Sequence, residues 1–587
     1  MRRLLAPFRL LAQAFTAVRN QPVTLLVATL CGVATFLSYP NAGLWPLSFL
    51  SLAPLLVIAE KGSVRAAFGW AMVTAIVTNV GGFYWITNLL RDFAAMPLPL
   101  ALGLLLLLAA QQGLSIGVGV AAGRWLRLRN AGPAWLIYPL AMTLAEALNP
   151  MIFPWALGHA QVPNLPLAQL AELGGVSLLT FVLAATNTVV ADLIARPKRE
   201  GAPRRALIAA ALLVLLHLGG WLRMSAIDAD IAAAPSLKVG VVEANIGVKE
   251  KHNSRLAINN LLIHQRESQL LEQQGAELIV WPETMFSPPR TLTATGRYEN
   301  RGRAREDARL GRGIGRDTTW FPRSDAPLVD DSNDDFAEGT SLADRSVPQR
   351  GFSTPLLTGL VTMRPLTEEE QLREPPGAGN RMVYNSAVLL NAEGEVMGLA
   401  DKKFLMPFSE NFEAGRWLYY LTGVDLFELP GMGDFSAGTE PVLLTLPRSN
   451  GPEARIGALI CYEDIMPAYT REVAAKQPNL LINITNDAWF GKTSEPALHF
   501  ALARFRAIEL RTTLIRSTNT GISGRVDPVG RLLEQTSLDG AETLLLDVPL
   551  MTARKTLFVL AGEWPAAVSA LLLAWLLFAA RRRASRS

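Results

Sequence analysis

The chain has 587 residues, half of them hydrophobic, and its mean hydropathy is positive. This length predicts two or more domains, and a formal net charge of only +4 gives little support to nucleic-acid binding. The two cysteines, Cys31 and Cys461, lie far apart, one in an apolar run and one in a polar region, which excludes a disulfide framework. An unpaired cysteine in a polar region favours a reactive thiol.

Apolar stretches long enough to span a bilayer dominate the first part of the chain. A span needs roughly 17–25 residues, and the sequence predicts seven before residue 225 and an eighth near the C-terminus. They lie near residues 22–38, 44–60, 66–90, 97–123, 133–150, 169–195, 205–223 and 557–580. We therefore expect a multi-domain protein with an eight-helix transmembrane bundle. Seven helices lie in residues 1–224, a large polar domain covers 225–556, and a last helix at 557–580 precedes a basic tail at 581–587.

Basic residues alternate between the short loops of this bundle. If every second loop is taken as cytoplasmic, nearly all loop Lys and Arg fall on that side, and the opposite short loops hold only Arg91. Because Lys and Arg resist translocation, we expect both termini inside and residues 225–556 outside. The cytoplasmic set is Arg2, Arg3, Arg9, Arg19, Lys61, Arg65, Arg124, Arg127, Arg129, Arg196, Lys198, Arg199, Arg204, Arg205, Arg581, Arg582, Arg583 and Arg586.

The polar domain has the pattern of an α/β fold. The β-rich run LKVGVVEANI follows Ser236, a helical stretch covers Ser254 to Gln274, and AELIVWPET supplies a second strand. This βαβ order predicts sheets with helices outside them. Glu283 follows the second strand at its C-terminal end, where α/β folds usually place their chemistry. Taken alone, this residue is as well explained as an exposed strand-end carboxylate.

Two further strand ends carry reactive groups. The segment YNSAVLLNAEGEVMGLADKKFLMPFSE predicts a hairpin, followed by Lys402 and Lys403 and, after Pro407, by Glu410. A β-prone run that begins at Ile456 ends at Cys461, next to two carboxylates. Separately, the lysines are also consistent with a solvated strand edge and the cysteine with a buried structural residue.

Together the three strand ends supply a carboxylate, an ammonium group and a thiol. A carboxylate can take the thiol proton, and a nearby ammonium group lowers the pKa of the thiol and stabilises an oxyanion. This set is sufficient for acyl transfer without histidine. The histidines of the domain, His252, His264 and His499, lie in no comparable sequence setting.

The motifs VWPET, DKKFLMPFSE and LICYED, in this order, resemble those of the nitrilase (carbon–nitrogen hydrolase) superfamily with its Glu-Lys-Cys triad. The similarity continues through NITNDAWFGKTSEPALHFALARFRAIELRTTLIRSTNTGISGRVDPVGR. With the expected spans, and with FPWALGHAQVPNLPLAQLAELGG at 153–175, nearly the whole chain is similar to the membrane-bound apolipoprotein N-acyltransferase family. The resemblance implies a nitrilase-like αββα sandwich in residues 225–556.

The resemblance also implies roles for individual residues. Glu283 would be the general base, Lys402 the oxyanion-stabilising lysine and Cys461 the nucleophile. Lys402, rather than Lys403, matches the family lysine because it stands eight residues before the Glu of the Pro-Phe-x-Glu segment. The implied supporting residues are Glu410, Tyr462, Glu463 and Trp489, with the backbone N–H of Tyr462 as a second oxyanion donor.

The reaction implied by the resemblance has two steps. A phospholipid, typically phosphatidylethanolamine, donates an acyl chain to Cys461 as a thioester. The α-amino group of the diacylglyceryl-cysteine at the N-terminus of an apolipoprotein then takes the acyl chain. The family places this catalytic domain on the periplasmic side of the bacterial inner membrane. No metal ion or soluble cofactor is implied.

Some features depart from the family, and two other functions stay open. Residues 287–350 exceed the usual connection and predict a surface insertion or a lid. Near Lys402, three residues differ from the usual ones, which changes the expected packing: Ala400, Phe404 and Ser409. The first alternative function is a membrane-anchored amidohydrolase of the nitrilase type. The second is a catalytically silent relative that binds lipoproteins.

Overall fold

The structure is a computed structural model of the whole chain. It describes residues 21–92, 94–196, 201–247, 257–285, 314–315, 347–369, 381–407, 410, 435–538 and 540–585. The chain divides into two compact units, which we call the helical unit (Met1–Asp228, Ile508–Leu510 and Lys555–Ser587) and the α/β unit (Ala229–Ala507 and Arg511–Arg554). The expected insertion at 287–350 lies outside the described residues except for 314–315 and 347–350.

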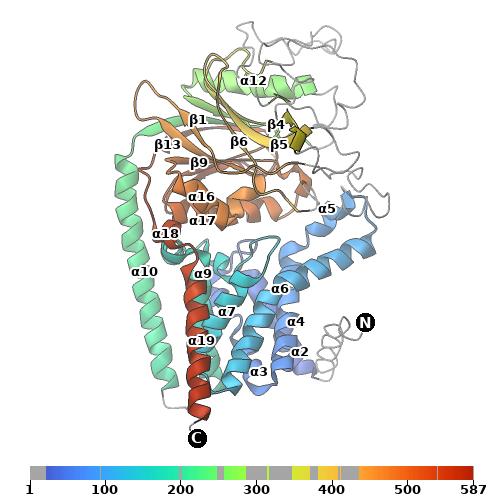
Figure 1. The fold of residues 1–587 in the computed structure, drawn as a ribbon, viewed down its shortest axis with the longest axis vertical. Coiled ribbons are helices and arrows are strands. Elements are labelled where there is room, and N and C mark those ends of the chain that lie inside the picture. The colour runs from blue at the N-terminus through green and yellow to red at the C-terminus, as the bar shows by residue number, and fades with distance from the viewer. Residues whose placement is uncertain are drawn as a thin grey trace. The chain divides into compact units, whose positions relative to one another are not determined.

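The helical unit consists of long apolar helices joined by short connections (Figure 1). Its described elements are α2 (Pro22–Ser38), η1 (Trp45–Phe49), α3 (Ala53–Lys61), α4 (Val64–Phe83), α5 (Ile86–Asp92), α6 (Leu98–Leu128), α7 (Ala134–Leu148), η2 (Leu157–Gln161), α8 (Leu165–Ala168), α9 (Ala171–Ala195), α10 (Ala202–Ala233), α18 (Leu557–Ala561) and α19 (Trp564–Ala584).

Five helices of the described chain are long and apolar enough to cross a membrane: α4, α6, α9, α10 and α19. Two further apolar helices, α2 and α7, have only 17 and 15 residues. The stretch expected as a span near 44–60 forms η1 and the nine-residue helix α3. Pro46 and Pro54 are the second residues of these two elements. Because proline lacks an N–H group and its ring clashes with the preceding turn, a helix cannot continue through it undisturbed. The structure thus shows five candidate spans, and the expected eight are not shown.

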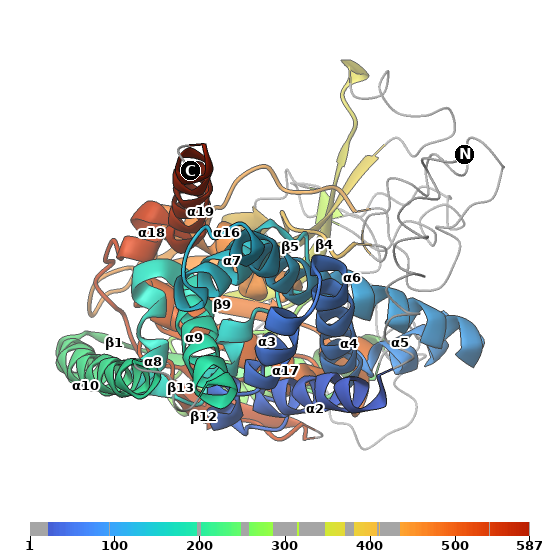
Figure 2. The ribbon, with the colours of Figure 1, turned by 90° about the horizontal axis from the view of Figure 1, so that it is seen from below.

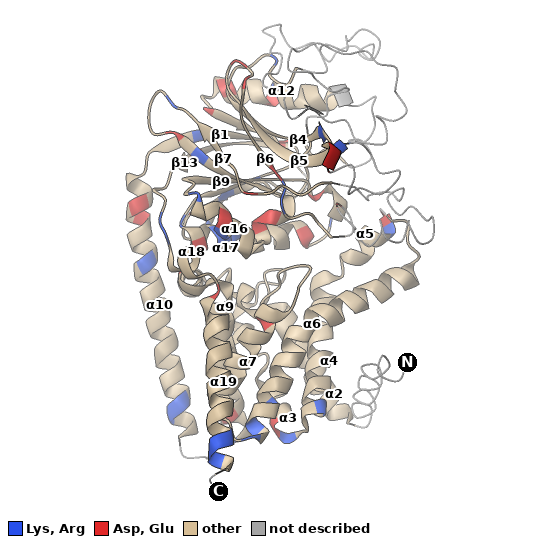
Figure 3. Ribbon diagram, viewed as in Figure 1, with Lys and Arg blue, Asp and Glu red and all other residues tan. Residues whose placement is uncertain are grey.

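At one end of the helical unit, arginine side chains contact backbone carbonyls of neighbouring connections. Arg124 Nε donates to the Gly62 carbonyl between α3 and α4 (2.8 Å), and Arg583 at the end of α19 lies 3.4 Å from the Asn130 carbonyl after α6. Lys and Arg are concentrated at these helix ends (Figure 3). Basic loops that the sequence pattern assigned to one side are therefore close in space. By contrast, α10 lies at the edge of the bundle in both views (Figures 1 and 2). Only 11% of its most apolar 18-residue stretch is buried.

The α/β unit contains two sheets. The seven-stranded sheet has the order β13-β1-β2-β4-β5-β6, with β3 paired to β4, and the six-stranded sheet has the order β12-β11-β10-β9-β8-β7. Strands β1, β2 and β4 run parallel, as do β8, β9 and β10. The strands are β1 (Ser236–Glu243), β2 (Leu278–Val280), β3 (Ile314–Gly315), β4 (Leu356–Pro365), β5 (Arg381–Leu390), β6 (Val396–Asp401), β7 (Leu443–Leu446), β8 (Ala454–Ile460), β9 (Leu480–Thr485), β10 (Leu514–Thr518), β11 (Gly524–Val526), β12 (Leu532–Gln535) and β13 (Glu542–Pro549).

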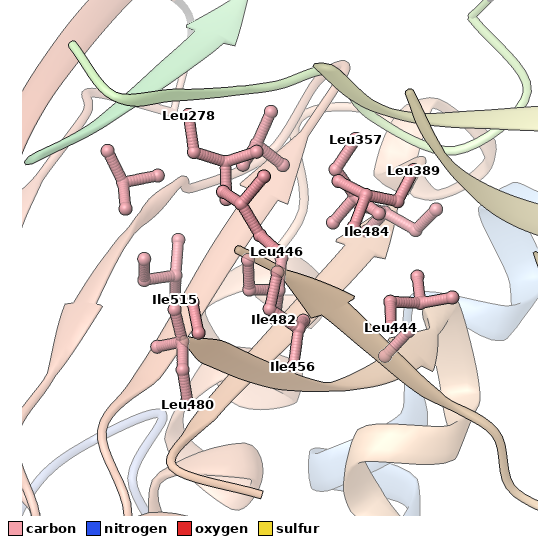
Figure 4. Packing of buried hydrophobic residues seen from close by; sticks show 14 of the residues in the cluster. Leu278, Leu357, Leu389, Leu444, Leu446, Ile456, Leu480, Ile482, Ile484 and Ile515 are labelled. Carbon is pink, nitrogen blue, oxygen red and sulfur yellow. The ribbon is translucent and has the colours of Figure 1, made fainter. Parts of the chain in front are cut away.

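Aliphatic side chains from both sheets form one core between them (Figure 4). Leu278 and Leu357 come from the first sheet, and Ile456, Ile482 and Ile515 from the second. Helix α12 (Ala257–Gln273) covers the outer face of the first sheet, and α16 (Pro467–Ala475) and α17 (Glu495–Leu510) cover that of the second (Figure 1). This is the expected αββα layering. Because parallel strands end at the same edge of a sheet, the segments after β8 and β9 lie together at one edge of the second sheet.

Candidate active site

Cys461 stands at the end of β8, where the chain turns into η5 (Cys461–Ile465). Its backbone φ is +53°, a left-handed conformation that residues other than glycine adopt uncommonly. Such strain persists only where neighbouring groups hold it, and it is concentrated at functional sites. The residue is partly exposed, and its side chain borders the core between the sheets.

Glu283 follows β2 and is seated against β4. Trp281, just before it, is fully buried and donates from its indole Nε1 to Ser268 of α12 (2.9 Å). Gly359 of β4 donates from its backbone N–H to the Pro282 carbonyl (3.2 Å). A Cβ atom on Gly359 would lie 2.6 Å from both the Glu283 Cα and the Thr284 nitrogen, so only glycine permits this close approach. The Glu283 backbone therefore depends on the absence of a side chain at position 359.

Lys402 follows β6 and brings a buried ammonium group to the same place. The residue is 1% exposed, and its Nζ lies 2.8 Å from Glu410 Oε2 and 3.5 Å from Glu283 Oε1. Lys403 points elsewhere and pairs with the exposed carboxylate of Glu472 (2.6 Å). Adjacent side chains of an extended segment face opposite ways, so only one of the two lysines can join the carboxylates.

Asn385 of β5 joins the same cluster, and the sequence analysis missed it. Its Nδ2 donates to Glu283 Oε1 (2.6 Å) and lies 3.3 Å from Glu410 Oε1, and its backbone carbonyl accepts from the Lys402 N–H (2.8 Å). The Met406 N–H also donates to Glu410 (2.8 Å). A buried Asn within the apolar strand of YNSAVLL was the signal that could have indicated a polar role, because buried amides need hydrogen-bond partners.

The electrostatics of the site follow from this crowding. Loss of hydration and the negative charge of Glu283 raise the pKa of the Cys461 thiol well above its usual range, and Lys402 opposes this. For Lys402, burial favours the neutral amine, but the charges of Cys461, Glu410 and Glu283 outweigh it and raise the pKa of the ammonium group well above its usual range. The thiol therefore needs a base to release its proton, and Lys402 remains charged when it does.

Glu463 holds the backbone around the site. Its Oε1 accepts from the N–H groups of Lys403 (2.7 Å) and Phe404 (3.1 Å), and its Oε2 accepts from that of Ile460 (2.9 Å). Burial raises the pKa of Glu463 to about 8, although these three N–H groups favour the carboxylate. This side chain thus links the end of β8 to the segment that carries Lys402.

The two remaining expected residues lie near the same edge of the second sheet. Tyr462 is the first residue after Cys461, in η5, and is 4% exposed. Trp489 lies in η6 (Asp487–Phe490), the short helix that follows β9. The geometry brings Glu283, Lys402 and Glu410 into direct contact, whereas it leaves the part played by Tyr462 and Trp489 as a prediction.

His499 is not in the plain setting that the sequence analysis assumed. It lies on α17, with its Nε2 2.8 Å from Asp464 Oδ1 and its Nδ1 3.0 Å from Arg516 Nη2. Asp487, Glu495 and His499 present ligand atoms within 4.8 Å of one another, the spacing of a metal site. However, Arg516 Nη2 also donates to Asp487 Oδ2 (2.9 Å), so a guanidinium cation already contacts two of these three groups.

Two family models match this chain. The model described as Apolipoprotein N-acyltransferase N-terminal domain matches residues 31–189, and the model described as Carbon-nitrogen hydrolase matches residues 359–557. The Apolipoprotein N-acyltransferase of Geobacter metallireducens is 30% identical over 521 residues, which cover 87% of this chain and 87% of that relative. The chain belongs to the apolipoprotein N-acyltransferase family.

Other members of the apolipoprotein N-acyltransferase family are similar over nearly the full chain. The relative from Bradyrhizobium diazoefficiens is 31% identical over 599 residues, covering 96% of this chain and 95% of its own. Among solved structures, an amidase from Nesterenkonia sp. is 17% identical and covers 53% of this chain and 90% of its own, with a TM-score of 0.30. The family models and the curated relatives confirm the resemblance to the apolipoprotein N-acyltransferase family that the sequence predicted.

A methyl group at position 359 should displace Glu283. We expect Gly359→Ala to slow the reaction of Cys461 with iodoacetamide by roughly 10²-fold, the usual effect of moving a reacting group by about 1 Å. A Cys31→Ala background leaves Cys461 as the only thiol for this measurement. Gly103→Ala is the control, since nothing lies within 4 Å of a Cβ there. Equal rates in the two variants would contradict the seating of Glu283 by β4.

The two adjacent lysines should differ sharply. Lys402→Ala removes the cation beside Glu283 and Glu410 and should slow thioester formation on Cys461 by roughly 10²–10³-fold. Lys403→Ala removes only a surface pair and should keep most of the rate. Mass spectrometry after incubation with phospholipid alone measures the thioester. If Lys403→Ala were the inactive variant, the roles given to Lys402 and Glu410 would both be wrong.

Proposed function

We propose that this protein transfers an acyl chain from a phospholipid, through a thioester on Cys461, to the α-amino group of the diacylglyceryl-cysteine of apolipoproteins. The observation that carries the proposal is the buried contact of Lys402 with Glu283 and Glu410 next to the strained Cys461 turn. The family to which the chain belongs supports the lipoprotein substrate. Phosphatidylethanolamine is the proposed donor.

In the first half-reaction Glu283 takes the proton of the Cys461 thiol. The thiolate attacks the ester carbonyl carbon of the phospholipid, and a tetrahedral oxyanion forms. The Lys402 ammonium group and the backbone N–H of Tyr462 stabilise this oxyanion. When the intermediate collapses, the C–O bond to the glycerol breaks and Glu283 returns its proton to the leaving oxygen. The products are the Cys461 thioester and a lysophospholipid.

In the second half-reaction the acceptor amine attacks the thioester carbonyl. Glu283 accepts the proton that the amine loses, the C–S bond breaks, and the Cys461 thiolate recovers the proton from Glu283. A thioester intermediate divides one difficult amide-forming reaction into two easier steps. Glu410 and Asn385 hold Lys402 and Glu283, Glu463 fixes the backbone between them, and Trp489 supports substrate binding.

We further propose that α2, α7 and the η1–α3 segment complete the membrane bundle begun by the five long helices. Two helix pairs that pack closely at a glycine favour this assignment, because small residues at helix contacts are typical of membrane bundles. A Cβ atom on Gly32 of α2 would lie 2.6 Å from the Thr74 carbonyl oxygen of α4, and one on Gly119 of α6 would lie 2.9 Å from the Met142 Cα of α7. The basic loops then face the cytoplasm, and the α/β unit faces the periplasm.

Two other functions are less well supported. A catalytically silent lipoprotein-binding relative has no need to bury Lys402 between two carboxylates beside a strained cysteine, since this arrangement has a cost in stability. A membrane-anchored amidohydrolase would use the same triad but release the acyl group to water. The match of residues 31–189 to the N-terminal domain of the acyltransferase family favours transfer over hydrolysis.

Replacement of Cys461 tests the chemistry. Purified protein incubated with phosphatidylethanolamine and a diacylated lipopeptide should yield triacylated lipopeptide and lysophospholipid in equal amounts. Cys461→Ala should abolish both products while the protein still inserts into membranes, and Cys31→Ala should retain them. Free fatty acid in place of triacylated lipopeptide would indicate the amidohydrolase-type reaction. Full transfer by Cys461→Ala would refute the thioester.

Cysteine labelling tests the orientation. In a background without native cysteines, Glu440→Cys in the α/β unit should react with a membrane-impermeant maleimide in intact spheroplasts. Ser585→Cys, after α19, should react only once the membrane is made permeable. Both positions are exposed in the structure, so failure to label would reflect the membrane barrier. The opposite pattern would place the α/β unit in the cytoplasm and contradict the lipoprotein proposal.

A further inference from the structure

The strained turn at Cys461 is in contact with a side chain outside the proposed triad. Asn483 of β9 donates from its Nδ2 to the carbonyl oxygen of Cys461 (3.0 Å) and lies 3.4 Å from that of Leu459. Both carbonyls flank the point where β8 ends and the left-handed turn begins. Asn483 is fully buried, so a lost hydrogen bond there would not be replaced easily by water.

The register of the second sheet places this contact in a row. Asn483 pairs with Leu459 of β8 on one side and with Arg516 of β10 on the other. The neighbouring residues Ile482 and Ile484 belong to the core between the sheets. Because successive side chains of a strand alternate between faces, Asn483 and Arg516 lie on the opposite face, toward α17.

Arg516 fixes Asn483 from the other side. Its guanidinium group is fully buried and donates to Asn483 Oδ1 (3.3 Å), Asp464 Oδ2 (2.6 Å) and Asp487 Oδ2 (2.9 Å). Asp464 lies in η5, the helical turn that starts at Cys461. The planar guanidinium group, with its fixed donors, thus determines where the Asn483 amide and the η5 turn sit relative to each other.

The sulfur itself has a neighbour on the same strand as Asn483. The hydroxyl group of Thr485, at the end of β9, is within hydrogen-bonding reach of the Cys461 thiol and lowers its pKa, although hydration loss raises that pKa more strongly. One strand therefore contacts both the carbonyl and the sulfur of Cys461. A shift of the turn against β9 would change the direction of the thiol.

We propose that Asn483 is a positioning residue for Cys461, and that Arg516 acts through it by fixing its amide. The Asn483 hydrogen bond holds the left-handed backbone of Cys461 so that the sulfur faces Glu283 and Lys402. This inference rests on the proposed role of Cys461 as the nucleophile. It differs from a purely structural role, because a structural role would affect folding but not the reactivity of each folded molecule.

The test compares Asn483, within β9, with Asn479, which immediately precedes that strand. Asn483→Ala removes the donor to Cys461, whereas Asn479→Ala removes hydrogen bonds to the β8 strand region at the opposite end of β9, at Glu453 and Arg455. Both variants are made in the full chain with Cys31→Ala, so that iodoacetamide reports Cys461 alone. The alkylation rate per folded molecule, its dependence on pH, the KM for phospholipid and the Tm are measured.

We expect Asn483→Ala to slow alkylation and thioester formation about 10-fold, the effect of one lost hydrogen bond to a buried group, and to leave the KM within about twofold. Asn479→Ala should lower the Tm to a similar extent without changing the rate per folded molecule. Asn483→Leu keeps the volume of the side chain without its donor and should reproduce the slow rate.

The possible outcomes are separable. If folded Asn483→Ala and Asn483→Leu are alkylated as fast as the Cys31→Ala protein, the inference is wrong. It is also wrong if neither variant folds, because Asn483 would then be needed for folding and not specifically for the reactivity of Cys461. Neither result would contradict the proposed function. That function is tested separately, by acyl transfer in the unmutated protein and by its loss in Cys461→Ala. A slow rate shared by Asn479→Ala would also overturn the inference.

Discussion

The buried Lys402 ammonium group is the constraint on which the site depends. Breaking a buried ion pair by removing one partner typically costs about 3–5 kcal/mol, and Lys402 has two partners, Glu283 and Glu410. These carboxylates come from segments after β2 and after β6, so the first sheet must pair in one register before the charges meet. Asn385, between them on β5, satisfies the carboxylates from a third strand.

This arrangement also lowers the free-energy cost of moving the proton from Cys461 to Glu283. When the Cys461 proton moves to Glu283, one negative charge is removed and another appears on the sulfur, next to the same ammonium group. The net charge of the cluster stays constant, so the buried site need not stabilise a new charge at the start of the reaction. Lys402 stays charged throughout this transfer, because the negative charges of Cys461, Glu410 and Glu283 raise the pKa of its ammonium group despite its burial.

The sequence predicted the parts of the site that stand at strand ends. Glu283, Lys402 and Cys461 follow β2, β6 and β8, and the alternation of strand side chains separates Lys402 from Lys403. Contacts that depend on how strands pair were not predictable from a single strand. Asn385 and Asn483 lie in largely apolar strands, and His499 meets Asp464 only after α17 packs on the second sheet.

The membrane region shows a different limit of sequence reading. Apolar length alone suggested a span near 44–60, but Pro46 and Pro54 divide that stretch into two short helices. Hydropathy measures the solvent that a segment prefers, and it carries little information on where the backbone can remain helical. The family of the whole chain could nevertheless be predicted from the sequence, because its motifs lie at the ends of β2, β6 and β8, where the residue types are restricted.

The guanidinium group of Arg516 has a consequence for biogenesis. Arg516 comes 52 residues after Asp464 in the chain, yet it secures the turn on which Cys461 stands. A nascent polypeptide that has emerged only as far as β9 contains Asn483 but lacks the guanidinium group that holds both the Asn483 amide and Asp464. The full set of contacts around the Cys461 turn therefore forms only when β10 is added to the sheet.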